Sequence, residues 1–443
     1  MKRYKEYKDS GVEWIGEIPS HWEVKKINHE LDLLTDYVAN GSFESLAKNV
    51  EYLDEPDYAI LLRTQDYNKQ FEGPFVYISE KSYNFLKKSE LIEGDLVISN
   101  VGSVGTIFKV PKLDRPTSLA PNAILVRTKQ CNEYIYYFIK STVGQKSLED
   151  ITSFTAQPKF NKTSFRTIKI LVPKMEEQIK IVEYLDKRTL KIDNIISKKE
   201  ELIETLKASR TKLISETVTK GLDKNIPMKD SGVEWIGEIP SHWEVKKLKH
   251  ISERIEVGIA ESTTDSYSES GIPIIRSTNV DNSTVDTNNL LYIKESFANK
   301  NKSKYLYEGD LITVRTGNVG RTAVITKELN KSQCFTMLMT TLRCKNNPYF
   351  YNYYMNSSLV KSYLELISWG TAQQNISVAI LMELLVVSLT EKEQEEIVKY
   401  LDNKVQKIDK NILKIEEQIE FLKKAKQKLI TEVVTGKIDV TNI

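Results

Sequence analysis

The sequence KDSGVEWIGEIPSHWEVKK occupies residues 8–26 of this 443-residue chain and returns, letter for letter, at residues 229–247. Shorter matches follow both copies in the same order: Glu-Gly-Asp-Leu at 93–96 and 308–311, Gly-x-Val-Gly at 102–105 and 317–320, and Glu-Gln-x-x-Ile-Val-x-Tyr-Leu-Asp at 177–186 and 393–402. One repeat is therefore about half of the chain. So long a spacing indicates a tandem duplication rather than a solenoid, in which repeats run roughly 20–50 residues.

The overall composition narrows the function classes. The chain has 63 Lys and Arg against 61 Asp and Glu, so its formal charge of +2 gives no general signal for nucleic-acid binding. Three cysteines without a Cys-x-x-Cys pair argue against a disulfide framework and against a structural zinc site. The N-terminus lacks the apolar core of a signal peptide, and no run approaches about 18 apolar residues. We therefore expect a cytoplasmic protein that does not cross a membrane.

Each copy contains a mixed region followed by a helical region. In the mixed regions, short apolar and β-branched runs alternate with Gly, Pro, Asn and Asp, which is typical of strands and turns. In the helical regions Gly disappears and Glu, Lys, Leu and Ile dominate. The predicted fold is two tandem α/β (α+β) domains separated by an antiparallel coiled coil, with pseudo-two-fold symmetry from the duplication. In chain order, we predict an N-terminal arm (1–26), a first globular domain (27–173), a central long helix (174–220), a linker (221–247), a second globular domain (248–389) and a C-terminal long helix (390–439).

Apolar residues in the two predicted helices recur at alternating steps of four and three, which is the pattern of a heptad seam. The pattern is rougher in the first helix, where Arg188, Lys199 and Ser209 interrupt it. An exposed seam of this length would aggregate, so we expect the two helices to pair with each other. The predicted seam residues are Leu185, Ile192, Ile195, Leu202, Leu206 and Leu213 in the first helix, and Leu401, Val405, Ile408, Ile412, Ile415, Ile419, Leu422 and Leu429 in the second.

Motifs of catalysis and metal binding are missing. There is no GxxxxGK[ST] nucleotide loop and no HExxH zinc motif. The two Gly-x-Val-Gly segments lie between strand-like runs, which favours hairpin turns over phosphate loops. The sequence Asn-Pro-Tyr-Phe at 347–350 is superficially similar to a methyltransferase motif, but it lacks the second proline and favours a helix start. The four histidines are interpreted as packed residues of the repeat blocks. We expect no catalytic residue, no metal site and no cofactor in this chain.

Local basic stretches within the neutral chain suggest contact with phosphate. Residues 96–113, 156–174 and 311–327 contain lysine or arginine and no acidic residue. A solvated surface is an equally good explanation of these stretches.

Segments that combine arginine with amide side chains follow strand-like runs in both copies. Arginine can read guanine, and Asn or Gln can read adenine, through paired hydrogen bonds at the base edge. Turn capping is the alternative role for each of these residues. The candidate DNA-binding residues are Arg63, Thr64, Gln65, Asn100, Ser103, Lys109, Gln157, Lys159 and Lys162 in the first copy, and Arg276, Ser277, Asn279, Arg315, Asn318, Arg321, Gln373, Gln374 and Asn375 in the second.

The repeated block, the Glu-Gly-Asp-Leu and Gly-x-Val-Gly segments, Gly-Thr-Ala-Gln-Gln-Asn-Ile-Ser at 370–377 and the Glu-Gln helix openings together resemble the specificity subunit of type I restriction-modification systems. The resemblance covers nearly the whole chain. The first copy departs from it at residues 154–161, where the glycine before Thr155 and the Gln-Asn-Ile-Ser continuation are missing.

The resemblance implies that each globular domain is a target recognition domain that reads one half of a bipartite, asymmetric site in double-stranded DNA. It implies that the helices set the spacing and dock two methyltransferase subunits, which methylate adenine at N6 with S-adenosylmethionine. A motor-nuclease subunit that uses ATP and Mg would join for cleavage. The specificity subunit itself would be non-catalytic and would bind no cofactor. A coiled-coil adaptor and a self-sufficient DNA-modifying enzyme are the alternatives.

Overall fold

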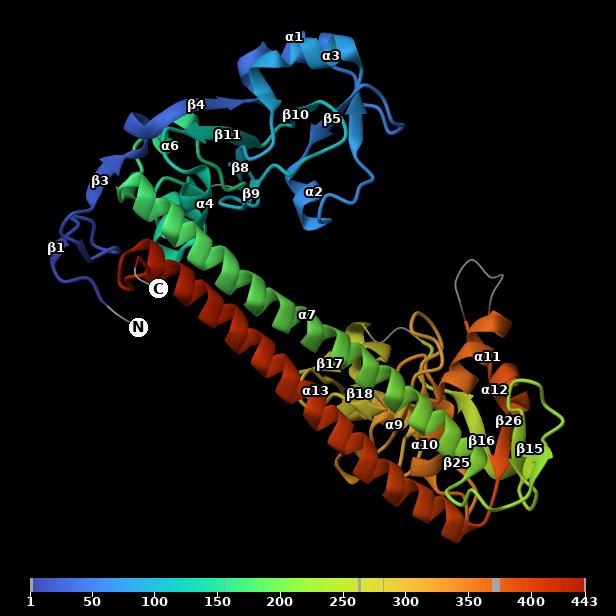
Figure 1. Cartoon of the computed structure of the whole chain (residues 1–443). Coiled ribbons are helices and arrows are strands. Elements are labelled where there is room, and N and C mark those ends of the chain that lie inside the picture. Colours follow the sequence, from blue (N-terminus) through green and yellow to red (C-terminus); the bar gives the residue numbers. More distant parts are fainter. Residues whose placement is uncertain (1–2, 155, 262–263, 282, 369–374, 442–443) are drawn as a thin grey trace. The chain divides into compact units, whose positions relative to one another are not determined.

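The computed structural model describes residues 3–154, 156–261, 264–281, 283–368 and 375–441. The chain divides into two compact units (Figure 1). Unit 1 contains described residues from 1–199 and 417–443, and unit 2 contains those from 200–416. Unit 1 therefore combines residues from both ends of the sequence.

The central sheet of unit 1 is antiparallel and has the strand order β4-β11-β8-β9. Its side chains alternate between two cores, as the two-residue period of a strand requires. Leu96 and Ile98 face the core that contains Tyr134 and Phe138 of α4, whereas Val97 faces a core shared with a second sheet. These elements are β4 (Leu31–Asp36), β8 (Leu96–Ser99), β9 (Ile107–Lys109), β11 (Ala123–Thr128), α4 (Asn132–Lys140) and α5 (Thr142–Asp150).

The second sheet of unit 1 has the order β6-β5-β10-β7. Strand β10 runs parallel to β5, and the other pairs are antiparallel. Short helix α1 (Phe43–Asn49) leads from β4 into this sheet, α2 (Thr64–Asn68) and α3 (Glu80–Phe85) lie between its strands, and α6 (Lys162–Phe165) precedes the last strand of the unit. The strands are β5 (Ala59–Leu62), β6 (Val76–Ile78), β7 (Glu90–Leu91) and β10 (Thr117–Leu119).

Unit 2 repeats this topology. Its central antiparallel sheet has the order β16-β25-β22-β23, and the order β21-β18-β24 of its second sheet, with β18 parallel to β24, matches β6-β5-β10. The central elements are β16 (Ser252–Val257), β22 (Leu311–Thr313), β23 (Thr322–Val324), β25 (Leu338–Leu342), α10 (Pro348–Met355) and α11 (Ser358–Ser368). The others are β17 (Tyr267–Ser268), β18 (Ile272–Ile275), β19 (Val280–Asp281), β20 (Thr284–Val285), β21 (Leu291–Ile293), β24 (Gln333–Cys334), α8 (Leu248–Ile251), α9 (Glu295–Lys300) and α12 (Val378–Glu383).

The two copies of the repeated block have the same local structure. In unit 1, β1 (Tyr7–Asp9) and β2 (Glu17–Pro19) form a hairpin, and β3 (Glu23–Lys26) pairs with β12 (Lys169–Val172). In unit 2, β13 (Met228–Asp230) pairs with β14 (Glu238–Pro240), and β15 (Glu244–Lys247) pairs with β26 (Leu385–Ser388). The antiparallel pairing is the same in both, so the duplication extends from sequence to strand register.

Two long helices follow the globular regions. Helix α7 spans Met175–Lys220, and α13 spans Glu391–Val434. In both, a glycine in the left-handed conformation follows the helix, Gly221 with φ 72° and Gly436 with φ 69°, which is a common way to end a helix. Helix α13 therefore ends earlier than residue 439, the predicted limit.

The helix segments within each unit run antiparallel. In unit 1, Asp193 of α7 pairs with Lys426 of α13, and Lys199, further along α7, contacts Gln418, which lies earlier in α13. In unit 2, Arg210 pairs with Asp409. The mixed α/β fold with long paired helices is thus confirmed.

The predicted seam holds for α13 and needs a correction in α7. In α13, every predicted seam residue is buried or half-buried. In α7, Ile195 and Leu202 are each 45% exposed, so their assignment to the seam is wrong. The neighbouring Ile196 and Ile203 are buried instead, at 9% and 6% exposure.

The error has a simple geometric reason. At 195–196 and 202–203 two apolar residues are adjacent, about 100° apart around the helix, so the pattern fits either choice. The polar residues that complete the correct column are Thr189, which is buried, Lys199, which contacts Gln418, and Arg210, which pairs with Asp409. Because these positions of the seam are polar, the pattern of apolar residues alone does not indicate them.

The ends of the long helices pack against the repeated blocks. In unit 1, Trp22 shares a core with Val433 and Val434 of α13, and in unit 2 Trp243 shares a core with Val218 of α7. A Cβ at Gly436 would lie 2.3 Å from Pro19 Cδ, so only glycine fits there. Residues 430–440 of unit 1 thus take the place that residues 214–221 take in unit 2.

None of the described helices combines the length and the apolar character needed to cross a bilayer. Among the described residues, no three His, Cys, Asp or Glu side chains lie together as metal ligands.

Candidate nucleic-acid interface

The two Gly-x-Val-Gly segments form tight turns between antiparallel strands. The first joins β8 to β9, and the second joins β22 to β23. All four glycines have φ between 79° and 86°, a conformation that side chains disfavour. The predicted hairpin turns are confirmed.

Each turn lies beside a polar segment that is distant in sequence. In unit 1, Val101 pairs with Lys159, and the Gly102 amide donates to the Pro158 carbonyl at 3.0 Å. Asn100 Nδ2 donates to the Phe160 carbonyl at 3.1 Å. These contacts bring two of the candidate segments, around 100–103 and 157–162, onto one surface.

The same arrangement recurs in unit 2. Thr316 pairs with Asn375, and the Ile376 amide donates to the Arg315 carbonyl at 3.0 Å. Arg315 Nε also donates to Asn375 Oδ1 at 2.9 Å. The equivalence of Lys159 and Asn375 shows that the two units present different chemistry at the same position.

The remaining candidates of unit 1 differ in accessibility. Ser103, Gln157 and Lys159 are exposed. Lys162 forms an ion pair with Asp36 at 2.7 Å, and the ammonium of Lys109 lies 5.6 Å from the ring centroid of Tyr136. Thr64 and Gln65 lie in the short helix α2, away from this turn in sequence.

In unit 2, Asn318 is exposed at the tip of the turn. Arg321, at the end of the same turn, forms an ion pair with Asp281 at 3.2 Å. This pair links the turn to the loop that carries Arg276 and Ser277. Gln373 and Gln374 lie outside the described residues, as does the preceding Gly-Thr-Ala sequence at 370–372.

Arg63 and Asn279, two candidate DNA-binding residues, make structural contacts within their own loops. Arg63 holds the buried carboxylate of Asp66 with contacts of 2.7 and 3.2 Å. Asn279 is 3% exposed, and its Oδ1 accepts a hydrogen bond from the Arg276 amide at 3.0 Å. Both residues lie where a strand ends and the backbone needs hydrogen-bonding caps. Turn capping is the alternative role given for them in the sequence analysis.

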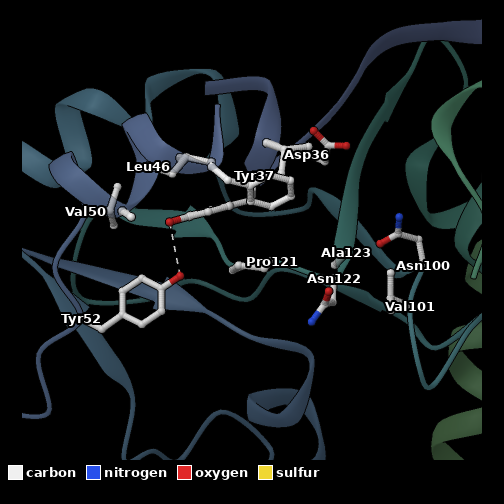
Figure 2. A pocket seen from close by; sticks show the side chains of 13 residues that line it. Asp36, Tyr37, Leu46, Val50, Tyr52, Asn100, Val101, Pro121, Asn122 and Ala123 are labelled. Atoms are coloured by element: carbon white, nitrogen blue, oxygen red, sulfur yellow. Dashed lines mark hydrogen bonds between the residues drawn. The ribbon is translucent and has the colours of Figure 1, made fainter. Parts of the chain in front are cut away.

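A cavity of about 540 Å³ opens beside the turn of unit 1 (Figure 2). Asn100, Asn122, Tyr37 and Tyr52 line it, and the Oδ1 atom of Asn100 is buried without a hydrogen-bond partner among the described residues. Tyr52 and the neighbouring Phe43 are 53% and 83% exposed. Sequence reasoning missed these aromatic residues, because nothing in the pattern distinguishes an exposed ring from a core ring.

The Glu-Gln helix openings anchor the repeated blocks. Glu177 accepts hydrogen bonds from Trp22 Nε1 at 3.0 Å and from the Tyr4 hydroxyl at 2.6 Å, and it contacts His21 Nε2 at 3.0 Å. In unit 2, Glu393 contacts Trp243 Nε1 at 3.1 Å and His242 Nε2 at 2.7 Å. The histidines beside Trp22 and Trp243 therefore belong to a packing contact.

In unit 2 this contact shifts the pKa of the Glu393 carboxyl group. Burial works against ionisation of Glu393, but hydrogen bonds from His242, Thr390 and Trp243 outweigh it and lower the pKa of Glu393 to about 2.

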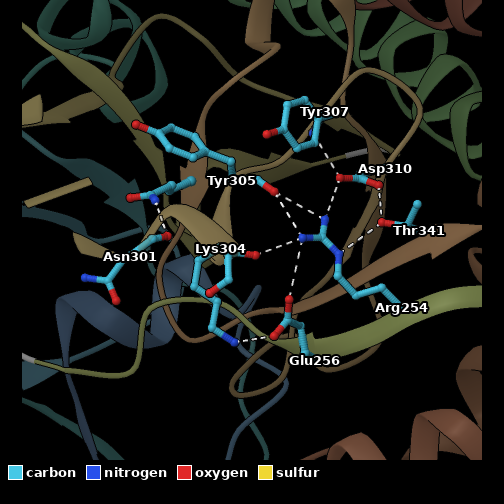
Figure 3. A network of polar contacts seen from close by, with 10 residues as sticks. Arg254, Glu256, Asn301, Lys304, Tyr305, Tyr307, Asp310 and Thr341 are labelled. Atoms are coloured by element: carbon cyan, nitrogen blue, oxygen red, sulfur yellow. Dashed lines mark hydrogen bonds and ion pairs between the residues drawn. The ribbon is translucent and has the colours of Figure 1, made fainter. Parts of the chain in front are cut away.

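The Glu-Gly-Asp-Leu segments supply a buried aspartate in each unit. Asp95 pairs with Arg127 of β11, with its two oxygens 2.6 and 2.7 Å from Nε and Nη2. Asp310 pairs with Arg254 of β16 at 2.8 Å and also accepts from Thr341 (Figure 3). Strands β11 and β16 are not equivalent, so the two units supply the cation from different strands.

Together these features define a duplicated α/β protein in which each unit carries a turn, a facing polar segment and a share of a long helix pair. The family model described as the type I restriction modification DNA specificity domain matches residues 19–205 and 240–420. The chain belongs to this family, and the resemblance inferred from its motifs is confirmed.

Individual relatives agree over most of the chain. It is 25% identical to the type I restriction enzyme MjaVIII specificity subunit of Methanocaldococcus jannaschii, with 96% of this chain and 95% of that protein covered. It is 23% identical to the EcoKI specificity subunit of Escherichia coli K12, covering 87% and 82%.

Solved structures show the same fold. A chain from a study of assembly and conformational transition of the type I R-M system superposes with a TM-score of 0.69 at 15% identity, covering 95% of this chain and 99% of that chain. The HsdS subunit of Thermoanaerobacter tengcongensis gives a TM-score of 0.50 at 13% identity, covering 95% and 98%.

Proposed function

We propose that this chain directs a type I restriction-modification complex to its target, with unit 1 and unit 2 each reading one half of a bipartite, asymmetric DNA site. One observation carries the proposal. Both units place a glycine turn against a polar segment in the same way, yet the exposed side chains differ, with Ser103 and Lys159 in one and Asn318 and Asn375 in the other. Two units that share one backbone arrangement but expose different polar side chains suit a DNA site whose two halves differ in sequence.

The proposed chemistry of reading follows from these side chains. Asn318 and Asn375 can offer a donor and an acceptor to an adenine edge, and Arg315 can contact guanine. Lysines in the acid-free stretches around the turns would bind backbone phosphates, which position the protein without reading sequence. Arg63 and Asn279 would act indirectly, by holding their loops.

The long helices would set the gap between the two half-sites. Helices of 46 and 44 residues have lengths of ~69 and ~66 Å at 1.5 Å per residue, and paired helices are stiffer than a flexible linker. Both also expose large apolar side chains, including Leu190 at 61% and Phe421 at 71%. We infer that such residues help to dock two methyltransferase subunits.

The chemical steps would belong to the partners in this proposal. The methyltransferase subunits would bind S-adenosylmethionine and methylate adenine at N6, and a motor-nuclease subunit would use ATP and Mg. This chain would bind no cofactor and would act by recognition alone.

The test is to co-express this chain with the methyltransferase encoded beside it and to map N6-methyladenine across the host genome by single-molecule sequencing. A split, asymmetric motif that disappears when this chain is omitted is the expected result. Methylation that persists without this chain would refute the proposal. Methylation by the purified chain alone would favour a self-sufficient enzyme, and a complex without salt-sensitive DNA binding would favour an adaptor.

A further inference from the structure

The two units share a framework around the glycine turns that allows position-by-position comparison. A Cβ added at Gly105 would contact Leu148 of α5, and one added at Gly320 would contact Leu364 of α11. Each of these helices also contacts a long helix through a pair of hydroxyls, Thr142 with Thr431 at 3.0 Å and Ser358 with Ser215 at 2.8 Å. The helices α5 and α11 are therefore equivalent.

The long helices extend this equivalence. Asp193 and Lys426 form an ion pair in unit 1, and Asp409 and Arg210 form the corresponding pair in unit 2. The framework conserves charge at these two positions.

Two positions inside this framework differ in charge. Unit 1 has Thr106 after its turn and Gln145 one turn into α5, whereas unit 2 has Arg321 and Lys361. The side chain of Gln145 is satisfied, because its Nε2 donates to the carbonyls of Gly105 at 3.1 Å and Ile139 at 2.9 Å. Unit 2 thus places two cations where unit 1 has neutral groups.

Lys361 is half-buried, and no hydrogen bond or ion pair joins its ammonium to another of the described residues. Arg321 and Arg210 act against its positive charge, and the carboxylates of Glu365 and Asp281 act in its favour. Asp281 is engaged with Arg321, and Arg210 is held by Asp409. Burial, followed by the two arginines, lowers the pKa of Lys361, so its surroundings disfavour a charge that nothing within contact distance balances.

We propose that Lys361 and Arg321 bind one phosphate of the DNA backbone beside the Gly317 turn, and that unit 1 makes no equivalent contact. The inference rests on the proposed function, because it takes DNA as the source of the phosphate. An anion between the two side chains would supply the missing counter-charge, and arginine and lysine are the residues that bind phosphate best. The contact adjoins Asn318, so it would fix the distance between the reading side chain and the duplex.

The consequence is that the two half-sites are anchored unequally. The half-site read by unit 2 would gain a sequence-independent contact that the other half-site lacks. At this position only unit 2 would then contribute to the salt dependence of binding.

The experiment uses the complex of this chain with its methyltransferase and a DNA duplex that contains the motif found by methylome mapping. It measures how the binding constant of the complex for this duplex depends on salt concentration. Lys361→Gln and Arg321→Thr install the residues that unit 1 has at the equivalent positions, so both are compatible with the fold. Together they should lower the slope of log K against log salt by about 0.9, the value for one phosphate contact, and Lys361→Gln alone should lower it by part of this amount without changing the motif. Lys361→Arg should restore the slope. Lys361 should also react more slowly with an acylating reagent when the duplex is bound. Mass spectrometry of the modified protein reports this contact directly.

Lys224→Gln, at an exposed lysine of the same unit, is the matched control for a change of one charge. A slope that Lys361→Gln leaves unchanged, or that Lys224→Gln lowers equally, would overturn the inference while the proposed function stood. Lys361→Gln could abolish the binding of inorganic phosphate and leave the salt slope for DNA binding unchanged. That result would show that DNA is not the source of the phosphate and would overturn the inference. A wild-type complex without specific DNA binding would instead overturn the proposed function.

Discussion

Glu177 lies beneath the repeated block of unit 1, where Trp22 and Tyr4 donate to its carboxylate. Its side chain is 9% exposed, so water has little access to the carboxylate. Glu393 has the same role in unit 2, but its side chain is 27% exposed. The two anchors therefore differ in how much a lost contact should cost.

Glu177→Leu should destabilise unit 1, because it leaves two donors without an acceptor at about 1–3 kcal/mol each. Urea unfolding followed by tryptophan fluorescence measures the change. Glu393→Leu is the matched variant and should cost less, since the Glu393 carboxylate is more exposed to water than that of Glu177. Equal losses in the two variants would contradict this account of burial.

Acid should weaken unit 2 through Glu393. Its pKa falls from 4.5 to about 2 on folding, so its contribution is fully present above pH 4.5 and is lost as the pH falls towards 2. The Glu393→Gln variant should show a flatter dependence of stability on pH across this window. An unchanged pH profile in the variant would show that other groups dominate.

Asn318 occupies the tip of the unit 2 turn, and Ser103 occupies the same place in unit 1. Asn318→Ala should relax recognition of one half-site only, since a good base contact contributes about 1–3 kcal/mol of discrimination. Ser103→Ala should affect the other half-site. Methylome sequencing of both variants checks this, and relaxation of the same half-site by both would sink the assignment.

At the residue scale, the sequence predicted segments better than roles. Basic stretches and amide-rich segments predict Asn100, Lys159, Arg315 and Asn375 as candidates, and the structure places each of them at the glycine turn of its own unit. Asn279, predicted from a segment that combines arginine with an amide, is buried, because an amide that caps a loop and an amide that faces solvent have the same neighbours in sequence.

At the scale of elements, the seam between α7 and α13 combines apolar residues with ion pairs. The duplication, strands and long helices were predictable because their patterns repeat over many residues. The choice between Ile195 and Ile196 was not, because it depends on which side the partner helix approaches.

Ile196→Ala should lower stability by roughly 2–4 kcal/mol, as expected when a buried side chain leaves a cavity. Ile195→Ala is the neighbouring control and should cost less than about 1 kcal/mol, since the side chain is 45% exposed. Thermal melting of both variants distinguishes them. The opposite ranking would restore the seam first predicted from the sequence.

At the scale of the whole molecule, α7 and α13 each contribute to both units, with the division near Lys199 and Glu417. If the helices set the gap in the target, lengthening both by seven residues should preserve the heptad pattern and add about 10.5 Å. That corresponds to about three base pairs at 3.4 Å each. Methylome sequencing should then report a motif with a longer gap and unchanged half-sites.

The control is the same insertion in α7 alone. It should misalign the ion pairs Asp193–Lys426 and Arg210–Asp409 and reduce assembly of the complex. A double insertion that leaves the gap unchanged would show that something other than helix length fixes it.

The mixed origin of unit 1 has a consequence for synthesis of the protein. Trp22 emerges early from the ribosome, but Val433 and Val434, with which it packs, emerge some four hundred residues later. Unit 2 needs nothing beyond residue 416, so all of it is translated before the last segment of unit 1. A message cut short just after residue 416, within α13, would therefore produce a protein with one half ready to fold completely and the other lacking the end of its last helix.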